Sequence, residues 1–246
     1  MRFIYNIFGE GETLLLLHGW GGSSESFLRV QEFLSTNYRV IVLDLPGFGK
    51  SEEPKKPWNL DDYVEFLREF LSQMNIEKCS LAGHSFGGRI AIKFCAQYPE
   101  KIDKLVLIAC AGIKHKKSLE EKATNFFANV GKKIFSLPIL KNAYNPGRWV
   151  LYKLLLRRQD YYQANPLMRE TMKLVINEDL KPLLSKIAAP TLIIWGENDE
   201  ITPLEDARIM HREIQRSRLE IIKGAGHYLP RRNPEEIARL MKNFLR

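Results

Sequence analysis

The sequence has no apolar run long enough to cross a bilayer, and no pattern typical of a secretory signal opens it. The first continuous apolar stretch, residues 14–17, is short, and the polar residues 9–12 (Gly-Glu-Gly-Glu) precede it. A signal peptide needs a longer apolar segment behind a basic start. We therefore expect a protein that is neither inserted in a membrane nor secreted.

Cysteine is scarce, with three residues in 246. Cys79, Cys95 and Cys110 form no C-x-x-C pair, their number is odd, and each lies in an apolar stretch. These features exclude a disulfide framework and argue against a cysteine-rich metal site. The sequence predicts buried, reduced thiols and a cytoplasmic location.

Internal repeats, low-complexity segments and nucleic-acid recognition motifs are also missing. Residues 44–51 (Asp-Leu-Pro-Gly-Phe-Gly-Lys-Ser) do not have the glycine spacing of a P-loop. His18 and His84 have no third ligand at a useful spacing, so we expect structural histidines and neither a metal nor a cofactor. The partners we expect are a small-molecule substrate and, at most, a second copy of the chain, but no nucleic acid.

The formal net charge of +8 is concentrated in one stretch. Residues 113–180 hold nine lysines and four arginines against six acidic residues. This excess either favours anionic substrates or is only a solvated surface.

What the sequence does have is a regular alternation of apolar strands and amphipathic helices. The expected strands are residues 3–8, 13–17, 39–43, 79–82, 104–109, 190–196 and 219–222. Helices are expected over 26–34, over 59–74 with Asn59 as N-cap, over 89–96, after Thr202-Pro203 and after Asn233-Pro234. Continuously apolar strands separated by helices predict an α/β fold, with a mostly parallel sheet covered on both faces.

Residues 113–180 interrupt this alternation. Their pattern predicts short helices broken at Pro138, Pro146 and Pro166, with many aromatic residues. We interpret the stretch as a helical cap inserted into a core of residues 1–112 and 181–246.

Residues 83–88 (Gly-His-Ser-Phe-Gly-Gly) contain a G-x-S-x-G motif between an expected strand and an expected helix. Ser85 would occupy the apex of a sharp turn, and Gly83 and Gly87 would relieve the crowding there. The turn would raise the serine hydroxyl above the sheet at the N-terminus of the helix. The alternative is an ordinary glycine-rich turn in which the serine has no catalytic role.

Three further segments follow expected strands: residues 18–21 (His-Gly-Trp-Gly), 195–199 (Trp-Gly-Glu-Asn-Asp) and 224–227 (Gly-Ala-Gly-His). In an open parallel sheet such segments meet at the carboxyl edge of the strands, where ligands bind. A serine becomes an effective nucleophile when a histidine takes its proton and a carboxylate orients that histidine. Ser85, His227 and Asp199 are therefore the candidate catalytic residues.

The four segments, in this order, resemble those of the α/β-hydrolase fold family with a helical cap, over nearly the whole chain. The resemblance implies a catalytic triad in the chain order Ser85, Asp199, His227. The backbone amides of Trp20 and Phe86 are the candidate oxyanion-hole donors. The resemblance further implies that His18 orders the oxyanion loop and that His84 packs behind the turn.

The acid is the least constrained residue of this set. Glu197 and Glu200 flank Asp199 as weaker candidates, whereas residues 109–112, where some family members carry the acid, contain no carboxylate. For the substrate pocket we expect Phe126, Phe127 and Trp149 of the cap, together with Tyr228.

The leading hypothesis is a serine hydrolase of the carboxylesterase type, which cleaves a small-to-medium acyl ester through an acyl-enzyme. Similar folds hydrolyse carbon–carbon bonds in vinylogous diketones, but those relatives usually have tryptophan where this chain has Tyr228. A third hypothesis is a ligand-binding receptor with very slow turnover. Epoxide hydrolases and haloalkane dehalogenases of the family need aspartate at the position of Ser85.

Overall fold

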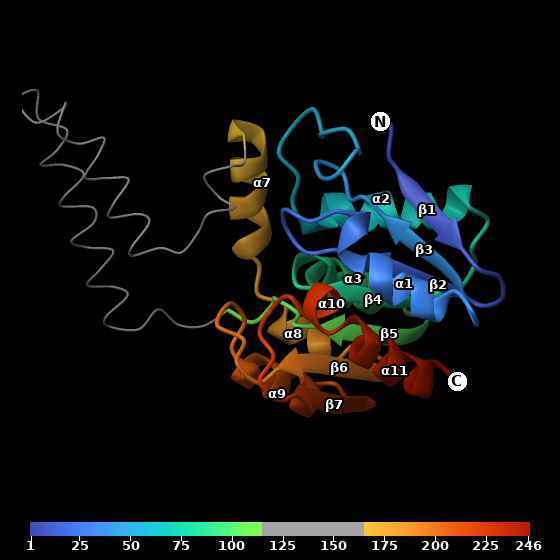
Figure 1. Cartoon of the computed structure of the whole chain (residues 1–246). Coiled ribbons are helices and arrows are strands. Elements are labelled where there is room, and N and C mark those ends of the chain that lie inside the picture. Colours follow the sequence, from blue (N-terminus) through green and yellow to red (C-terminus); the bar gives the residue numbers. More distant parts are fainter. Residues whose placement is uncertain (115–164) are drawn as a thin grey trace, which may run out of the picture. The chain divides into compact units, whose positions relative to one another are not determined.

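The computed structural model of the chain describes residues 1–114 and 165–246 (Figure 1). By its internal contacts the chain divides into two units. Residues 1–114 and 170–246 form the first, which we call the core unit, and residues 115–169 form the second. Of the expected cap residues, Phe126, Phe127 and Trp149 lie outside the described residues. The boundaries of the cap stay a prediction.

A seven-stranded sheet in the order β1-β3-β2-β4-β5-β6-β7 organises the core unit. Only β1 is antiparallel to its neighbour, and the other pairs are parallel. This arrangement confirms the expected α/β fold. The strands are β1 (Tyr5–Phe8), β2 (Thr13–Leu17), β3 (Arg39–Leu43), β4 (Cys79–His84), β5 (Ile102–Ile108), β6 (Thr191–Gly196) and β7 (Ser217–Ile222).

Helices cover both faces of the sheet, with α1 and α11 on one face and α2 and α3 on the other (Figure 1). The helices are α1 (Leu28–Leu34), α2 (Leu60–Gln73), α3 (Phe86–Gln97), α7 (Pro166–Ile176), α8 (Lys181–Leu184), α9 (Leu204–Glu213), α10 (Leu229–Arg232) and α11 (Pro234–Leu245). Two 3₁₀ turns, Ser24–Phe27 and Pro99–Lys101, complete the described elements. Among the described helices, none is both long and apolar enough to span a membrane.

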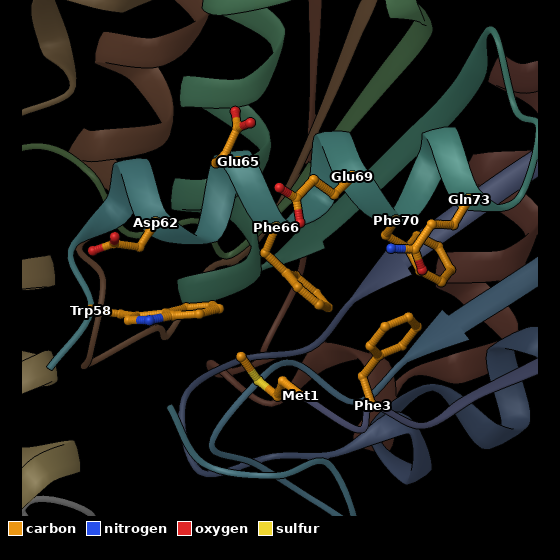
Figure 2. A pocket seen from close by; sticks show the side chains of 9 residues that line it. All are labelled: Met1, Phe3, Trp58, Asp62, Glu65, Phe66, Glu69, Phe70 and Gln73. Carbon is orange, nitrogen blue, oxygen red and sulfur yellow. The ribbon is translucent and has the colours of Figure 1, made fainter. Parts of the chain in front are cut away.

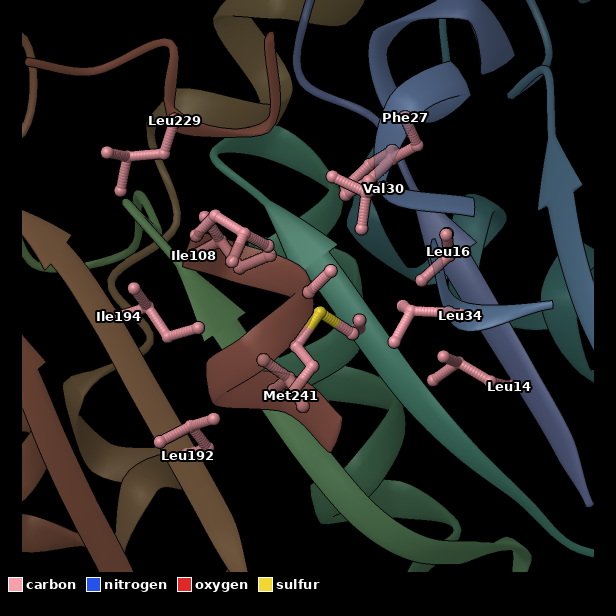
Figure 3. Close-up of a cluster of buried hydrophobic side chains, with 14 of the residues drawn as sticks. Leu14, Leu16, Phe27, Val30, Leu34, Ile108, Leu192, Ile194, Leu229 and Met241 are labelled. Carbon is pink, nitrogen blue, oxygen red and sulfur yellow. The ribbon is translucent and has the colours of Figure 1, made fainter. Parts of the chain in front are cut away.

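The central strands are buried on both sides, which explains their continuous apolar sequences. On one face, Leu14 and Leu16 of β2 and Ile194 of β6 pack against Phe27 and Met241, which come from opposite ends of the chain (Figure 3). All five side chains are fully buried. This core holds the strands in place, and the candidate site lies at their carboxyl ends.

Several expected boundaries shift. The expected strand 3–8 is paired only over β1, the central strand runs on from 79–82 to His84, and the expected helix 26–34 begins as a 3₁₀ turn. The helix expected at Asn59 is confirmed, because Asn59 and Asp62 form a reciprocal capping box. Asn233 stands at the N-cap of α11 but makes no side-chain capping bond there.

Candidate active site

Ser85 occupies the turn between β4 and α3 in a strained backbone conformation. Its φ of 50° and ψ of −107° lie where non-glycine residues are rarely found. The Ser85 amide donates to the Ile108 carbonyl (3.0 Å), and the Ser85 carbonyl accepts from the amides of Arg89 (3.2 Å) and Ala111 (3.3 Å). Such strain costs about 1–3 kcal/mol and persists only where the surroundings enforce it, commonly at active sites.

The glycines of the motif make this turn possible. A Cβ atom at Gly83 would collide with the carbonyl group of Gly87, and one at Gly87 would collide with the carbonyl groups of Leu17 and His18. The Gly87 amide also donates to the His18 carbonyl at 3.1 Å. The first turn of α3 is therefore held directly against the loop that follows β2.

His227 and Asp199 lie on the loops that follow β7 and β6, and their side chains are joined by a hydrogen bond. His227 Nδ1 is 2.8 Å from Asp199 Oδ2, and both side chains are almost fully buried. The Asn198 amide donates to the Ala225 carbonyl (2.8 Å), which ties the two loops together. Asp199 can thus fix the tautomer of His227 that leaves Nε2 free to accept a proton.

The Asp199 carboxylate is charged despite its burial. Burial by itself would raise its pKa, but hydrogen bonds from His227 and from the backbone amides of Thr202 and Ile201 hold the pKa below its ordinary value. Both amides donate to Oδ1 at 2.9 Å. A charged carboxylate here can stabilise a protonated histidine.

Thr202 is a site residue that sequence reasoning missed. Its hydroxyl precedes an expected helix and could cap it, but α9 begins at Leu204 without a side-chain cap. The hydroxyl instead donates to Asp199 Oδ2 (2.8 Å) and lies 3.2 Å from His227 Nδ1. The Trp195 indole N–H donates to the Thr202 carbonyl at 2.9 Å and holds the loop. In the sequence, only the position of Thr202, three residues after Asp199, could have pointed to this role.

His84 connects the turn to the His227 loop. Its Nε2 is 2.9 Å from the His227 carbonyl, which can only accept, so Nε2 carries the proton. Burial lowers the His84 pKa to about 3 and keeps the ring neutral. A Cβ atom at Gly19 would lie 2.9 Å from His84 Nδ1 and 3.4 Å from Ser85 Cβ. The neutral His84 ring therefore lies between the His227 loop and the loop after β2.

His18 orders the loop that follows β2. Its Nε2 accepts from the Leu45 amide (3.0 Å), so Nδ1 carries the proton and donates to the Gly19 carbonyl (2.8 Å). Burial lowers the His18 pKa to about 4. Asp44 accepts from the amides of Ser24 (2.6 Å) and Lys50 (2.9 Å), which orders the neighbouring turn.

The two expected oxyanion donors belong to these ordered segments. The Trp20 ring packs edge-on against Phe86 (5.2 Å between centroids) and Phe48 (4.8 Å). Within residues 1–114 and 165–246, neither the Trp20 amide nor the Phe86 amide has a hydrogen-bond acceptor. Both N–H groups therefore remain candidates for binding an oxyanion.

The other candidate residues of the site lie at the surface. Glu197 is exposed, and its carboxylate accepts from the Gly224 amide at 2.9 Å. Glu200 is also exposed, whereas Asp199 is buried and is hydrogen-bonded to His227 Nδ1. Tyr228 is 55% exposed, with its ring edge-on to His227 (5.6 Å between centroids).

Comparisons with known proteins identify the family of the chain. A family model described as alpha/beta hydrolase fold matches residues 12–230. The chain is 28% identical over 266 residues to a 2-hydroxy-6-oxo-6-phenylhexa-2,4-dienoate hydrolase of Comamonas testosteroni, covering 98% of this chain and 90% of that protein.

Two solved structures are similar. A bacterial membrane phospholipase A has a TM-score of 0.75 and 28% identity, with 98% of this chain and 81% of that chain covered. A thermophilic esterase of Thermogutta terrifontis has a TM-score of 0.76 and 25% identity, with 99% and 92% covered.

Proposed function

Because the chain belongs to the alpha/beta hydrolase fold family, we propose that it is a serine hydrolase that cleaves a small-to-medium acyl ester through an acyl-enzyme on Ser85. The observation that carries the proposal is the buried 2.8 Å hydrogen bond between His227 and Asp199, on loops that His84 ties to the strained Ser85 turn. A hydrogen-bonded imidazole and carboxylate near a strained serine suit nucleophilic acyl transfer.

In the first half of the reaction, His227 Nε2 takes the Ser85 hydroxyl proton while Ser85 Oγ attacks the ester carbonyl carbon. The amides of Trp20 and Phe86 donate to the oxyanion that forms, and removal of one such donor typically costs about 3–4 kcal/mol. The imidazolium, stabilised by Asp199, then gives its proton to the alkoxy oxygen. The alcohol leaves, and the acyl group remains on Ser85.

In the second half, water replaces the alcohol. His227 Nε2 takes one proton from the water as its oxygen attacks the acyl carbon, and the second tetrahedral intermediate uses the same amides. The bond from Ser85 Oγ to the acyl carbon then breaks, Ser85 regains its proton from His227, and the carboxylic acid leaves. No cofactor takes part in this scheme.

A second candidate is hydrolysis of a carbon–carbon bond in a vinylogous diketone. It is favoured by the 28% identity, over almost the whole chain, to a 2-hydroxy-6-oxo-6-phenylhexa-2,4-dienoate hydrolase. The same serine, histidine and acid would serve both reactions, so the substrate and not the triad distinguishes them.

The experiment measures turnover of p-nitrophenyl esters of graded acyl length and of 2-hydroxy-6-oxo-6-phenylhexa-2,4-dienoate by the purified protein and by Ser85→Ala. We expect ester hydrolysis that falls by about 10⁶ in Ser85→Ala. Faster cleavage of the dienoate than of every ester would establish the second candidate. Stoichiometric binding without steady-state turnover of either class would make the protein a receptor and refute the proposal.

Labelling with diisopropyl fluorophosphate tests the nucleophile independently of the substrate. The reagent transfers its phosphoryl group to an activated serine and releases fluoride. We expect a single modified peptide that contains Ser85. Modification of another serine, with Ser85 untouched, would contradict the assigned nucleophile.

A further inference from the structure

A cavity lies on the outer face of α2, where the N-terminal segment crosses the helix (Figure 2). Its volume of about 320 Å³ falls at the lower end of the range of small-molecule sites. We call it the aromatic pocket. Its lining residues are Met1, Phe3, Trp58, Asp62, Glu65, Phe66, Glu69, Phe70 and Gln73. None of them belongs to the candidate active site.

The walls of the aromatic pocket are mutually packed rings. Phe3 lies edge-on to Phe66 (5.4 Å between centroids) and to Phe70 (5.7 Å), and Trp58 lies 6.0 Å from Phe66. The Trp58 amide donates to the Thr171 hydroxyl (3.1 Å), and its ring packs edge-on to Tyr63 (5.0 Å). Contacts on both sides thus hold the Trp58 ring in place, so the pocket needs little rearrangement to accept a ligand.

The helix side of the aromatic pocket is acidic. Helix α2 carries four carboxylates and one arginine in a chain whose formal net charge is +8. Arg68 pairs with Glu65, and Asp62 accepts from the Asn59 amide. Glu69 forms neither a hydrogen bond nor an ion pair with any described residue. Figure 2 shows the carboxylate of Asp62 near Trp58 and that of Glu69 near Phe66.

We propose that the aromatic pocket binds an organic cation, an ammonium group carried on a small apolar body. Trp58 provides the ring face on which a cation is best stabilised, and the Asp62 and Glu69 carboxylates provide opposite charge beside it. Phe3, Phe66 and Phe70 cover the apolar body. An anion would be repelled by the three carboxylates, and a neutral apolar ligand would gain nothing from them. The site is independent of the proposed hydrolase activity.

Calorimetric titration of the intact protein with benzyltrimethylammonium tests the proposal, with benzyl alcohol and phenylacetate as the neutral and anionic comparisons of similar size. We expect saturable binding of the cation, at least about 5-fold tighter than that of benzyl alcohol, and no binding of phenylacetate. Binding should persist in Ser85→Ala, which separates this site from the proposed active site.

Two substitutions test whether the cation binds in the aromatic pocket. Trp58→Leu and Glu69→Gln should each weaken binding of the cation by about 5-fold, whereas Glu32→Gln on α1, across the sheet, should leave it unchanged. Glu69 is exposed, so its variant remains informative if Trp58→Leu fails to fold. Equal affinity for the cation and benzyl alcohol, loss of binding in Ser85→Ala, unchanged binding in Glu69→Gln, or no saturation would each overturn the proposal.

Discussion

Among the single residues of the candidate site, Asp199 connects the others through hydrogen bonds to its carboxylate. It accepts from His227 Nδ1, from the Thr202 hydroxyl and from the amides of Ile201 and Thr202. The amide contacts would suit any carboxylate at that position of the loop, whereas the hydroxyl contact depends on the side chain of residue 202. The acid and the hydroxyl can therefore be tested separately.

Asp199→Asn should lower ester turnover by about 10⁴, because an amide side chain favours the wrong tautomer of His227. Glu197→Gln is the matched control, since its carboxylate bonds to Gly224 and not to the histidine. The measurement is kcat/KM on the best ester of the panel. A larger loss in Glu197→Gln than in Asp199→Asn would move the acid to residue 197.

Thr202→Val should lower kcat by about 10-fold or more with little change in KM, because a hydrogen bond to a charged group contributes about 1.5–3 kcal/mol. Thr202→Ser keeps the hydroxyl and should restore most of the rate. A positioning role predicts this rescue. A loss in Thr202→Ser as large as that in Thr202→Val would contradict the positioning role of the hydroxyl.

Among the helices, α3 connects the Ser85 turn with the end of α7 and the residues that follow it. Arg89 Nη2 donates to the carbonyls of Val175 (2.6 Å) and Glu178 (2.5 Å), while its buried Nε has no partner among the described residues. Burial lowers the Arg89 pKa. One turn later, Lys93 pairs with Glu178 (2.6 Å) and with Asp61 of α2 (2.8 Å). Within the core unit, these two cations hold residues 175–178 against α3.

Arg89→Met should lower the free energy of unfolding by about 2–3 kcal/mol, because two carbonyls would lose a charged donor in a buried place. Arg68→Met on α2 is the control, since its pair with Glu65 is exposed and should be worth less than about 1 kcal/mol. Urea denaturation measures both. Equal effects would show that the Arg89 contacts contribute no more than a surface pair.

At the scale of the whole molecule, two buried neutral histidines make stability depend on pH. Burial lowers the pKa to about 4 for His18 and to about 3 for His84, against 6.5 for an unperturbed histidine. The unfolded chain therefore binds more protons than the folded one between these values. The stabilisation is complete above about pH 6.5 and is lost as the pH falls toward the folded pKa values.

Accordingly, the free energy of unfolding should fall between pH 6.5 and pH 4 by about 1.4 kcal/mol per pH unit for each of the two histidines. His84→Gln should remove about half of that slope, because one of the two buried neutral histidines is then absent. Urea titrations at several pH values provide the slope. The same slope in wild type and His84→Gln would contradict the assignment.

Features that depend on groups close together in the chain could be predicted from the sequence. Continuous apolar runs such as 13–17 predict strands buried on both faces, and Asn59 predicts the start of α2, because a capping box joins residues only three positions apart. The need for glycine at position 83 also has a local cause, since a Cβ atom there would collide with Gly87, four residues later in the chain. These features could be predicted because the groups that decide them are close in the chain.

The hydrogen-bond partner of each polar side chain, in contrast, depends on the tertiary structure. The Thr202 hydroxyl could cap α9 or bond to Asp199, and it bonds to Asp199. Because β6 pairs with β7, the loops that follow these strands lie close together, and Asp199 is also bonded to His227. His84 meets the carbonyl of a residue 143 positions away. The aromatic pocket likewise joins Met1 and Phe3 to α2. A side chain with several donors or acceptors bonds to whichever groups folding brings within reach, and a single sequence does not specify those groups.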